Sequence, residues 1–117
     1  MKKLRLIWIS VGLIAAAYLF WCYAHTESYC FFYPSIDTRY APGYSETAFS
    51  QIATGMTVQV VQQKLGTPLY IQHHANGELW SYTLDGKCRW GDWAWFGRQV
   101  EVQDGRVIGI INQVIYN

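Results

Sequence analysis

The sequence predicts an α+β domain of two layers, two short helices packed on a three-stranded antiparallel sheet, preceded by an N-terminal transmembrane or signal helix. Three observations predict it. An uncharged apolar run fills most of residues 1–24, residues 58–65 have the period of an amphipathic helix, and the chain after residue 68 alternates with a period of two. We therefore divide the chain into an anchor or signal segment at 1–24, a linker at 25–45 and a domain at 46–117.

The uncharged run from Leu6 to Ala24 is long enough to cross a bilayer. At roughly 1.5 Å per residue it spans about 28 Å, close to a hydrocarbon core of about 30 Å. Lys2, Lys3 and Arg5 precede the run. Positive charge favours the cytoplasmic side of a membrane. We therefore expect the N-terminus to stay inside and the domain to lie outside.

Three fates of this segment are open. Its length and the aromatic side chains near both ends favour an uncleaved signal anchor. A signal peptidase would instead cut between Ala24 and His25, after the small residue. Lipid attachment to Cys22 is disfavoured by the large side chains of residues 19–21. The sequence thus favours a retained membrane anchor with the C-terminal domain on the outer side, and the alternatives are lipid attachment or secretion.

The clearest element of the domain is a helix over about residues 58–65. Thr57 is a suitable N-cap, because its hydroxyl can accept a hydrogen bond from a free amide of the first turn. Val61 and Leu65 lie on one helical face. Gly66 supplies the left-handed residue that ends a helix, and Pro68 prevents its restart.

A second short helix is predicted upstream, over residues 45–52. The three predicted strands cover residues 79–84, 94–102 and 107–116. A Gly-containing turn at 103–106 joins the last two as a hairpin. These elements complete the two-layer domain.

Cysteine and histidine spacing indicates no metal or cofactor site. The exported part contains Cys30 and Cys88, which an oxidising compartment allows to pair. Two free thiols are the alternative, and sequence leaves both open. There is no Cys-x-x-Cys motif. Adjacent His73 and His74 would point to opposite faces of a strand.

Charge and composition exclude two function classes. Three of the nine basic residues precede the apolar run. The remainder of the chain therefore has six basic residues against eight acidic ones and is slightly acidic. It has no basic stripe for nucleic acid. We also find no nucleophile with a base at a useful spacing and no phosphate-binding glycine loop, so we expect no enzyme.

An ordered set of short motifs runs through the domain: Gly55, Met56, Thr57, Val61, Leu65, Gly66, Pro68, Trp80 and Tyr82, followed by residues 100–107. The set resembles the BamE (SmpA/OmlA) domain family of outer-membrane protein assembly, over about residues 46–112. The resemblance implies the helix–helix–three-strand order and a role in the cell envelope through protein contacts. It makes the outer-membrane assembly machinery a candidate partner. The poor lipoprotein signature departs from the family. With the resemblance we therefore expect the bacterial inner membrane with the C-terminal domain in the periplasm, and the alternatives are the outer membrane or secretion after signal cleavage.

The segment from 88 to 96 is the best candidate for partner binding, because tryptophan is favoured at the centres of interfaces. We single out Arg89, Trp90, Asp92, Trp93 and Trp95. The alternative is that Trp93 and Trp95 share one strand face and belong to the core. The expected function is a non-enzymatic envelope scaffold or assembly accessory. The alternative function is a tethered or secreted inhibitor or ligand-binding module.

Overall fold

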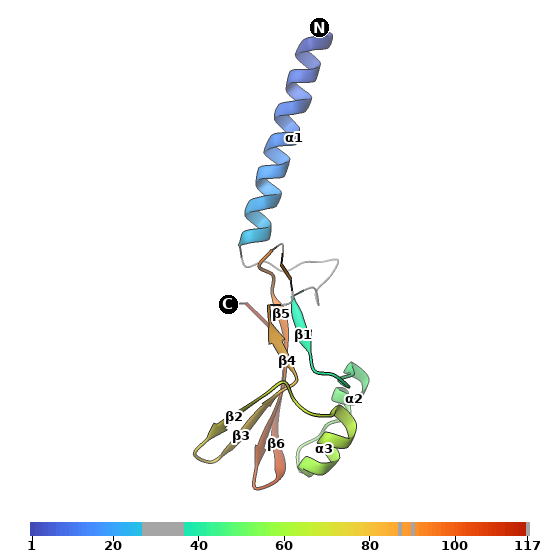
Figure 1. Cartoon of the computed structure of the whole chain (residues 1–117), viewed down its shortest axis with the longest axis vertical. Coiled ribbons are helices and arrows are strands. Elements are labelled where there is room, and N and C mark those ends of the chain that lie inside the picture. The colour runs from blue at the N-terminus through green and yellow to red at the C-terminus, as the bar shows by residue number, and fades with distance from the viewer. Residues whose placement is uncertain (27–36, 87, 90, 117) are drawn as a thin grey trace.

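The computed structural model describes residues 1–26, 37–86, 88–89 and 91–116. Over these residues the chain is α+β, with a long N-terminal helix above a small domain (Figure 1). In the described part the elements follow in the order α1 (Lys2–His25), β1 (Thr38–Tyr40), α2 (Glu46–Ser50), α3 (Val58–Leu65), β2 (Tyr70–His74), β3 (Gly77–Ser81), β4 (Thr83–Asp85), β5 (Trp95–Gln103) and β6 (Arg106–Ile115).

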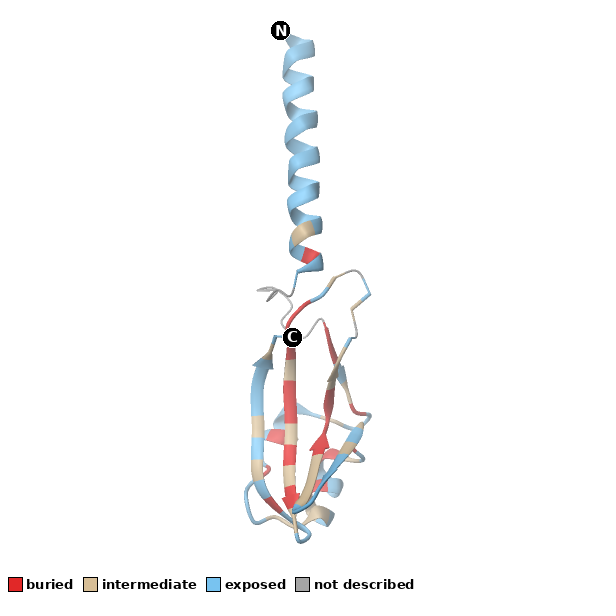
Figure 2. Cartoon of the chain, turned by 90° about the vertical axis from the view of Figure 1, so that its left-hand side faces the viewer, coloured by how far each residue is buried: buried red, intermediate tan, exposed pale blue. Residues whose placement is uncertain are grey.

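Helix α1 is apolar all round and projects from the domain. Among the described residues it is the helix long and apolar enough to cross a membrane, with a mean hydropathy of 1.9 and none of that window buried. Only its last turn contacts the domain closely, as the burial colours of Figure 2 show. A helix of this kind is compatible with a membrane anchor or a signal sequence.

The described strands form two antiparallel sheets, so the prediction of a single three-stranded sheet was wrong. The larger sheet has four strands in the order β2-β3-β5-β6, and the smaller one pairs β1 with β4. The additional strand β2 forms a hairpin with β3, from Tyr70 opposite Ser81 to His74 opposite Gly77. A short polar strand such as β2 gives little hydrophobic periodicity, which is why its extent was not predicted.

The predicted strand at 79–84 is divided because the chain changes partners at Tyr82. Ser81 still pairs with Gln99 of β5, whereas Thr83 pairs with Tyr40 of β1. The amide of Tyr82 donates to the carbonyl of Arg98 at 3.0 Å, and its own carbonyl accepts from Ala41 at 2.9 Å. Tyr82 therefore links the two sheets.

The predicted linker at 25–45 contains part of the domain. Residues 38–40 form β1, and Asp37, Thr38 and Ala41 are buried. Within the described residues the domain thus begins at Asp37 rather than at residue 46. A three-residue strand followed by Pro42 is too short for its period to be recognised in the sequence. Residues 27–36 lie outside the described residues.

Two buried threonines join the small sheet to the large one. The hydroxyl of Thr38 accepts a hydrogen bond from the amide of Phe96 at 2.9 Å, and that of Thr83 accepts from the amide of Arg98 at 2.8 Å. Both threonines are fully buried. They satisfy strand amides of β5 that would otherwise be buried without a backbone partner.

The core lies between the helices and one face of the four-stranded sheet. α3 begins and ends where the sequence predicts. The buried cluster combines side chains of α2, α3, alternate positions of β3, β5 and β6, and the segments beside these elements: Ala41, Phe49, Ile52, Val61, Leu65, Trp80, Tyr82, Val100, Val102 and Val107. Because side chains alternate along a strand, Leu79, Glu101 and Gln103 lie on the opposite, open face.

Arg98 holds α2 against the sheet. Its Nε donates to Oε1 of Glu46 at 3.0 Å, and its Nη1 donates to the carbonyl of Gln113 at 3.2 Å. The guanidinium also lies 4.7 Å from the ring centre of Phe96. This buried cation therefore has an anionic partner, a carbonyl and an aromatic face, as burial of a charge requires.

Candidate interaction surfaces

The motif residues around α3 have structural roles. The Thr57 hydroxyl accepts a hydrogen bond from the amide of Val60 at 3.4 Å, at the predicted N-cap. Gly66 ends the helix with φ of 75°, a conformation that favours glycine. Val61 and Leu65 are fully buried. The motif thus defines the helix ends and its buried face.

The residues before α3 bind the helix to β6. Gly55 has φ of 94° and donates its amide to the carbonyl of Val107 at 2.8 Å. The amide of Val107 in turn donates to the carbonyl of Met56 at 2.9 Å. The glycine conformation therefore allows a two-way backbone contact between the α3 turn and the sheet.

The Trp-x-Tyr pair of the sequence is also part of the core. The Trp80 indole donates to Glu78 at 2.8 Å. The Tyr82 hydroxyl donates to the carbonyl of Gly66 at 3.1 Å, and burial raises the pKa of Tyr82 to about 12. Pro68 is buried next to this region of the chain. The Tyr82 hydrogen bond thus connects the end of α3 to the sheet.

The structure places the five candidate partner-binding residues in different environments. Arg89 and Asp92 are exposed, whereas Trp93 and Trp95 are buried. Trp90 lies outside the described residues. The two described indole rings are therefore part of the interior and not an exposed binding surface. The alternation of Trp93 and Trp95 was the signal in the sequence for this arrangement.

The loop before β5 contacts the end of α1. The ring of Trp93 meets Tyr23 edge to face, with 4.9 Å between the ring centres. The amide of Asp92 donates to the carbonyl of Ala24, which is itself buried. A Cβ atom on Gly91 would lie 2.7 Å from that carbonyl, so the close approach requires glycine. No sequence pattern indicates this contact between distant segments.

Asp37 organises the same loop from the other side. Its carboxylate accepts hydrogen bonds from the amide of Cys88 at 2.8 Å and of Trp93 at 3.4 Å. Burial, together with the neighbouring Asp85, raises the pKa of Asp37. Cys88 is half-buried. The sequence left open whether Cys88 pairs with Cys30, and this question falls outside the described residues because Cys30 is not among them.

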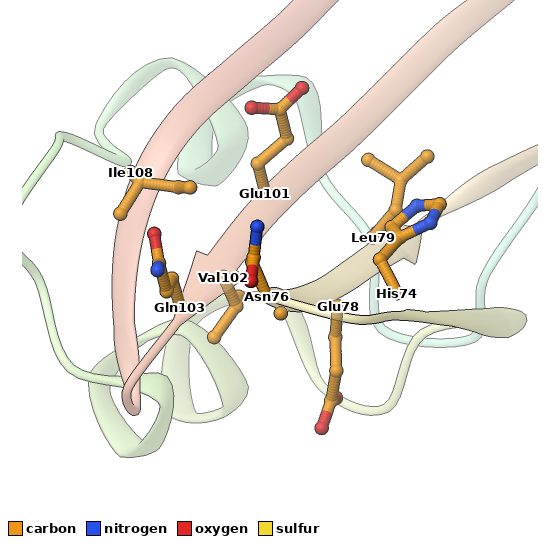
Figure 3. A pocket seen from close by; sticks show the side chains of 9 residues that line it. His74, Asn76, Glu78, Leu79, Glu101, Val102, Gln103 and Ile108 are labelled. Carbon is orange, nitrogen blue, oxygen red and sulfur yellow. The ribbon is translucent and has the colours of Figure 1, made fainter.

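The open face of the large sheet has a hollow at its far end from α1. The hollow has a volume of about 260 Å³ and lies where the β2–β3 and β5–β6 hairpins end (Figure 3). Leu79 and Ile108 supply apolar walls, and His74 and Glu101 supply polar groups. The carboxylate of Glu101 has no hydrogen-bond or ion-pair partner among the described residues. The hollow is lined by residues of all four strands of the large sheet, β2, β3, β5 and β6, so no local pattern in the sequence indicates it.

Strand β6 is an edge of the large sheet. From Val107 to Ile115 it contains neither proline nor a charged residue. Ile108, Ile110 and Val114 are exposed. The other edge, β2, presents mainly polar side chains to solvent. Exposed edges are normally blunted by charge, proline or a cover. Residues 55–57 cover only the first residues of β6, so from Ile108 onward β6 is an unprotected edge in the described part of the chain.

The described residues contain no group of three His, Cys, Asp or Glu side chains placed to hold a metal ion. His73 and His74 are exposed on β2. The chain matches no protein-family model, no curated protein and no solved structure. The resemblance to the BamE family therefore stays a prediction, and the fold and surfaces define a small α+β domain behind an apolar helix.

Proposed function

We propose that the chain is a non-enzymatic envelope protein whose α1 remains as an inner-membrane anchor and whose domain, in the periplasm, acts as a BamE-like scaffold or assembly accessory. The observation that carries the proposal is the packing of the last turn of α1 on the domain. A rigid junction between anchor and domain sets the height and orientation of the domain above a membrane. This is the property that a tethered scaffold requires.

The junction also supports retention of α1. The peptide bond between Ala24 and His25 lies inside the helix, and Ala24 is only 2% exposed. A retained anchor of this kind joins the apolar run to the domain through an unbroken helix. The helix also continues through Cys22, whose carbonyl accepts from the amide of Thr26 at 3.0 Å. Both alternative processing sites are therefore part of one continuous helix.

The open face and the β6 edge support a role in protein binding. Exposed apolar side chains rimmed by polar groups are typical of protein interfaces. Ile108 and Tyr70 are each more than half exposed on this part of the domain. We include the outer-membrane assembly machinery as a candidate partner because of the BamE resemblance.

The hollow near Glu101 favours one alternative, a tethered or secreted inhibitor or ligand-binding module of the same fold. At about 260 Å³ it is slightly smaller than the usual range of about 300–1,000 Å³ for small-molecule sites. It is also open, with walls from the hairpin ends. A protein side chain therefore fits it better than a whole small molecule.

The intact mass of the mature protein, extracted from membranes, tests the proposal. We expect the full chain, together with digestion of the domain by protease added to spheroplasts. A chain that starts at His25 would overturn the anchor and favour the inhibitor or binding-module function. A chain that starts at lipidated Cys22 would overturn the inner-membrane location and place the domain at the outer membrane.

A further inference from the structure

We propose that β6 accepts an extended segment of a partner protein as an additional antiparallel strand, and that Glu101 selects a lysine or arginine in that segment opposite Gly109. This inference deepens the proposed protein-binding role and rests on it. The juxtaposition that carries it is a carboxylate lying over a glycine of an unprotected edge strand.

Val107 at the start of β6 bonds to Gly55 and Met56, and beyond it no described backbone segment pairs with the outer edge of this strand. Its partner β5 lies on one side only, and β6 runs along nearly the full length of the domain. An edge strand presents unpaired amide and carbonyl groups to solvent at alternate positions. Addition of a strand to such an edge is a recurring mode of peptide recognition, in which the backbone provides affinity and side-chain pockets provide specificity.

Glu101 and Gly109 provide that specificity. The two residues are direct partners across the β5–β6 pair. A Cβ atom placed on Gly109 would lie 2.7 Å from Oε2 of Glu101, so the carboxylate lies over the glycine and extends toward the free edge. Glycine inside a strand often marks such a close approach. The absence of a side chain at Gly109 leaves the path from the edge to the carboxylate open.

Strand geometry brings a cation of an added strand within reach. Neighbouring strands lie about 4.8 Å apart. Because the Glu101 side chain already crosses from β5 to β6, a lysine opposite Gly109 has to cross only one further strand spacing. Cross-strand pairs of opposite charge stabilise a sheet. The aliphatic part of the lysine would lie against Ile108, which lines the hollow together with Glu101, and against Ile111, two positions after Gly109 on the same strand face.

A second copy of the chain does not fit this edge. The strands of the sheet run roughly along the axis of α1, and β6 returns from the hairpin end toward α1 (Figure 1). Antiparallel pairing of two β6 strands would reverse one copy and place the two α1 helices at opposite ends. Two anchors in one membrane exclude that arrangement. This excludes antiparallel pairing with a second copy, and the occupant that we propose is a segment of another protein.

The test uses the full chain in detergent micelles and a labelled, capped peptide of about nine residues, rich in Thr and Val with Lys at its centre. A matched peptide has Glu at its centre. Fluorescence anisotropy should show saturable binding with about a tenfold preference for the lysine peptide, since one charge is attracted and the other repelled. Equal affinities, or no saturable binding, would overturn the proposal.

Charge reversal tests whether Glu101 is the source of the preference for the lysine peptide. Glu101→Lys should reverse the preference, so that the glutamate peptide binds more tightly. Asp92→Lys is the control, because it makes the same charge change on an exposed side chain beside α1. It should keep the preference for lysine. A Glu101→Lys chain that folds by circular dichroism and still prefers lysine would refute the role of Glu101.

Two further measurements separate the alternatives. Gly109→Val should remove the lysine preference, because a branched side chain would block the path and displace the carboxylate. A concentration-dependent dimer that excludes the peptide would overturn the proposal, since a second copy would then occupy β6. The mass and topology of the anchor do not depend on how the two peptides bind. A failure of this inference can therefore be distinguished from a failure of the proposed anchoring.

Discussion

The contact between Tyr23 and Trp93 should couple the stability of the domain to the end of the anchor helix. Trp93 is 1% exposed, and its full truncation to alanine would cost roughly 3–5 kcal/mol. Trp93→Leu retains part of that volume and should cost less. An edge-to-face aromatic pair contributes about 0.5–1.5 kcal/mol beyond its buried area. We expect that amount as the coupling energy.

A double-mutant cycle measures the coupling. The free energy of unfolding is obtained by guanidinium titration of the full chain in micelles, for the parent, Tyr23→Ala, Trp93→Leu and the double variant. Removal of either ring abolishes the same contact. The double variant should therefore lose about 0.5–1.5 kcal/mol less than the sum of the two single losses.

Tyr18 supplies the control for this cycle. It lies on the exposed surface of α1 and stacks on Trp21 with 6.5 Å between ring centres, remote from the domain. Tyr18→Ala and Trp93→Leu should be additive within about 0.3–0.5 kcal/mol. If the Tyr23 cycle were equally additive, the last turn of α1 would not pack on the domain, and the reasoning about a rigid junction would be refuted.

Three further outcomes follow from the core. Leu65→Ala should lower the free energy of unfolding by about 2–5 kcal/mol in a denaturant titration, and a loss below about 1 kcal/mol would contradict its full burial. Thr83→Val should cost about 1–3 kcal/mol because the amide of Arg98 loses its acceptor, whereas exposed Thr47→Val should stay within about 0.5 kcal/mol. Because burial raises the pKa of Asp37 above 3.8, the folded chain binds this proton more tightly than the unfolded chain. The stability from Asp37 is therefore present below that value and lost as the pH rises through the raised pKa. The thermal unfolding midpoint of Asp37→Asn should therefore lack this decrease with pH. Midpoints of the parent and the variant are compared from about pH 3 to about pH 7, and identical profiles would disprove the contribution of Asp37.

Local signals were sufficient for α3 and for the hairpin of β5 and β6. Thr57 and Gly66 define the helix ends because capping and a left-handed residue are properties of the chain itself. The turn at Asp104 and Gly105 has positive φ at both residues, as its sequence predicts. The apolar length of α1 was likewise visible without any partner.

Pairing between distant segments was not visible in the sequence. β1 forms only because it pairs with β4, while Thr38 bonds to Phe96 and Ala41 bonds to Tyr82. Trp93 and Trp95 have the composition of a binding loop, but the end of α1 and the interior of the domain bury them. The same composition suits an interface or a core, and only the tertiary neighbours decide between them.

The sequence by itself determined the apolar helix, the α+β class and the ends of α3, because each depends on local periodicity or on one backbone conformation. The tertiary structure decided the number of sheets, the packing of α1 on the loop before β5, and the position of Glu101 over Gly109. Each of these depends on which segments lie side by side. Hydrogen bonds and side-chain packing between residues far apart in the chain set that arrangement, and no local pattern encodes it.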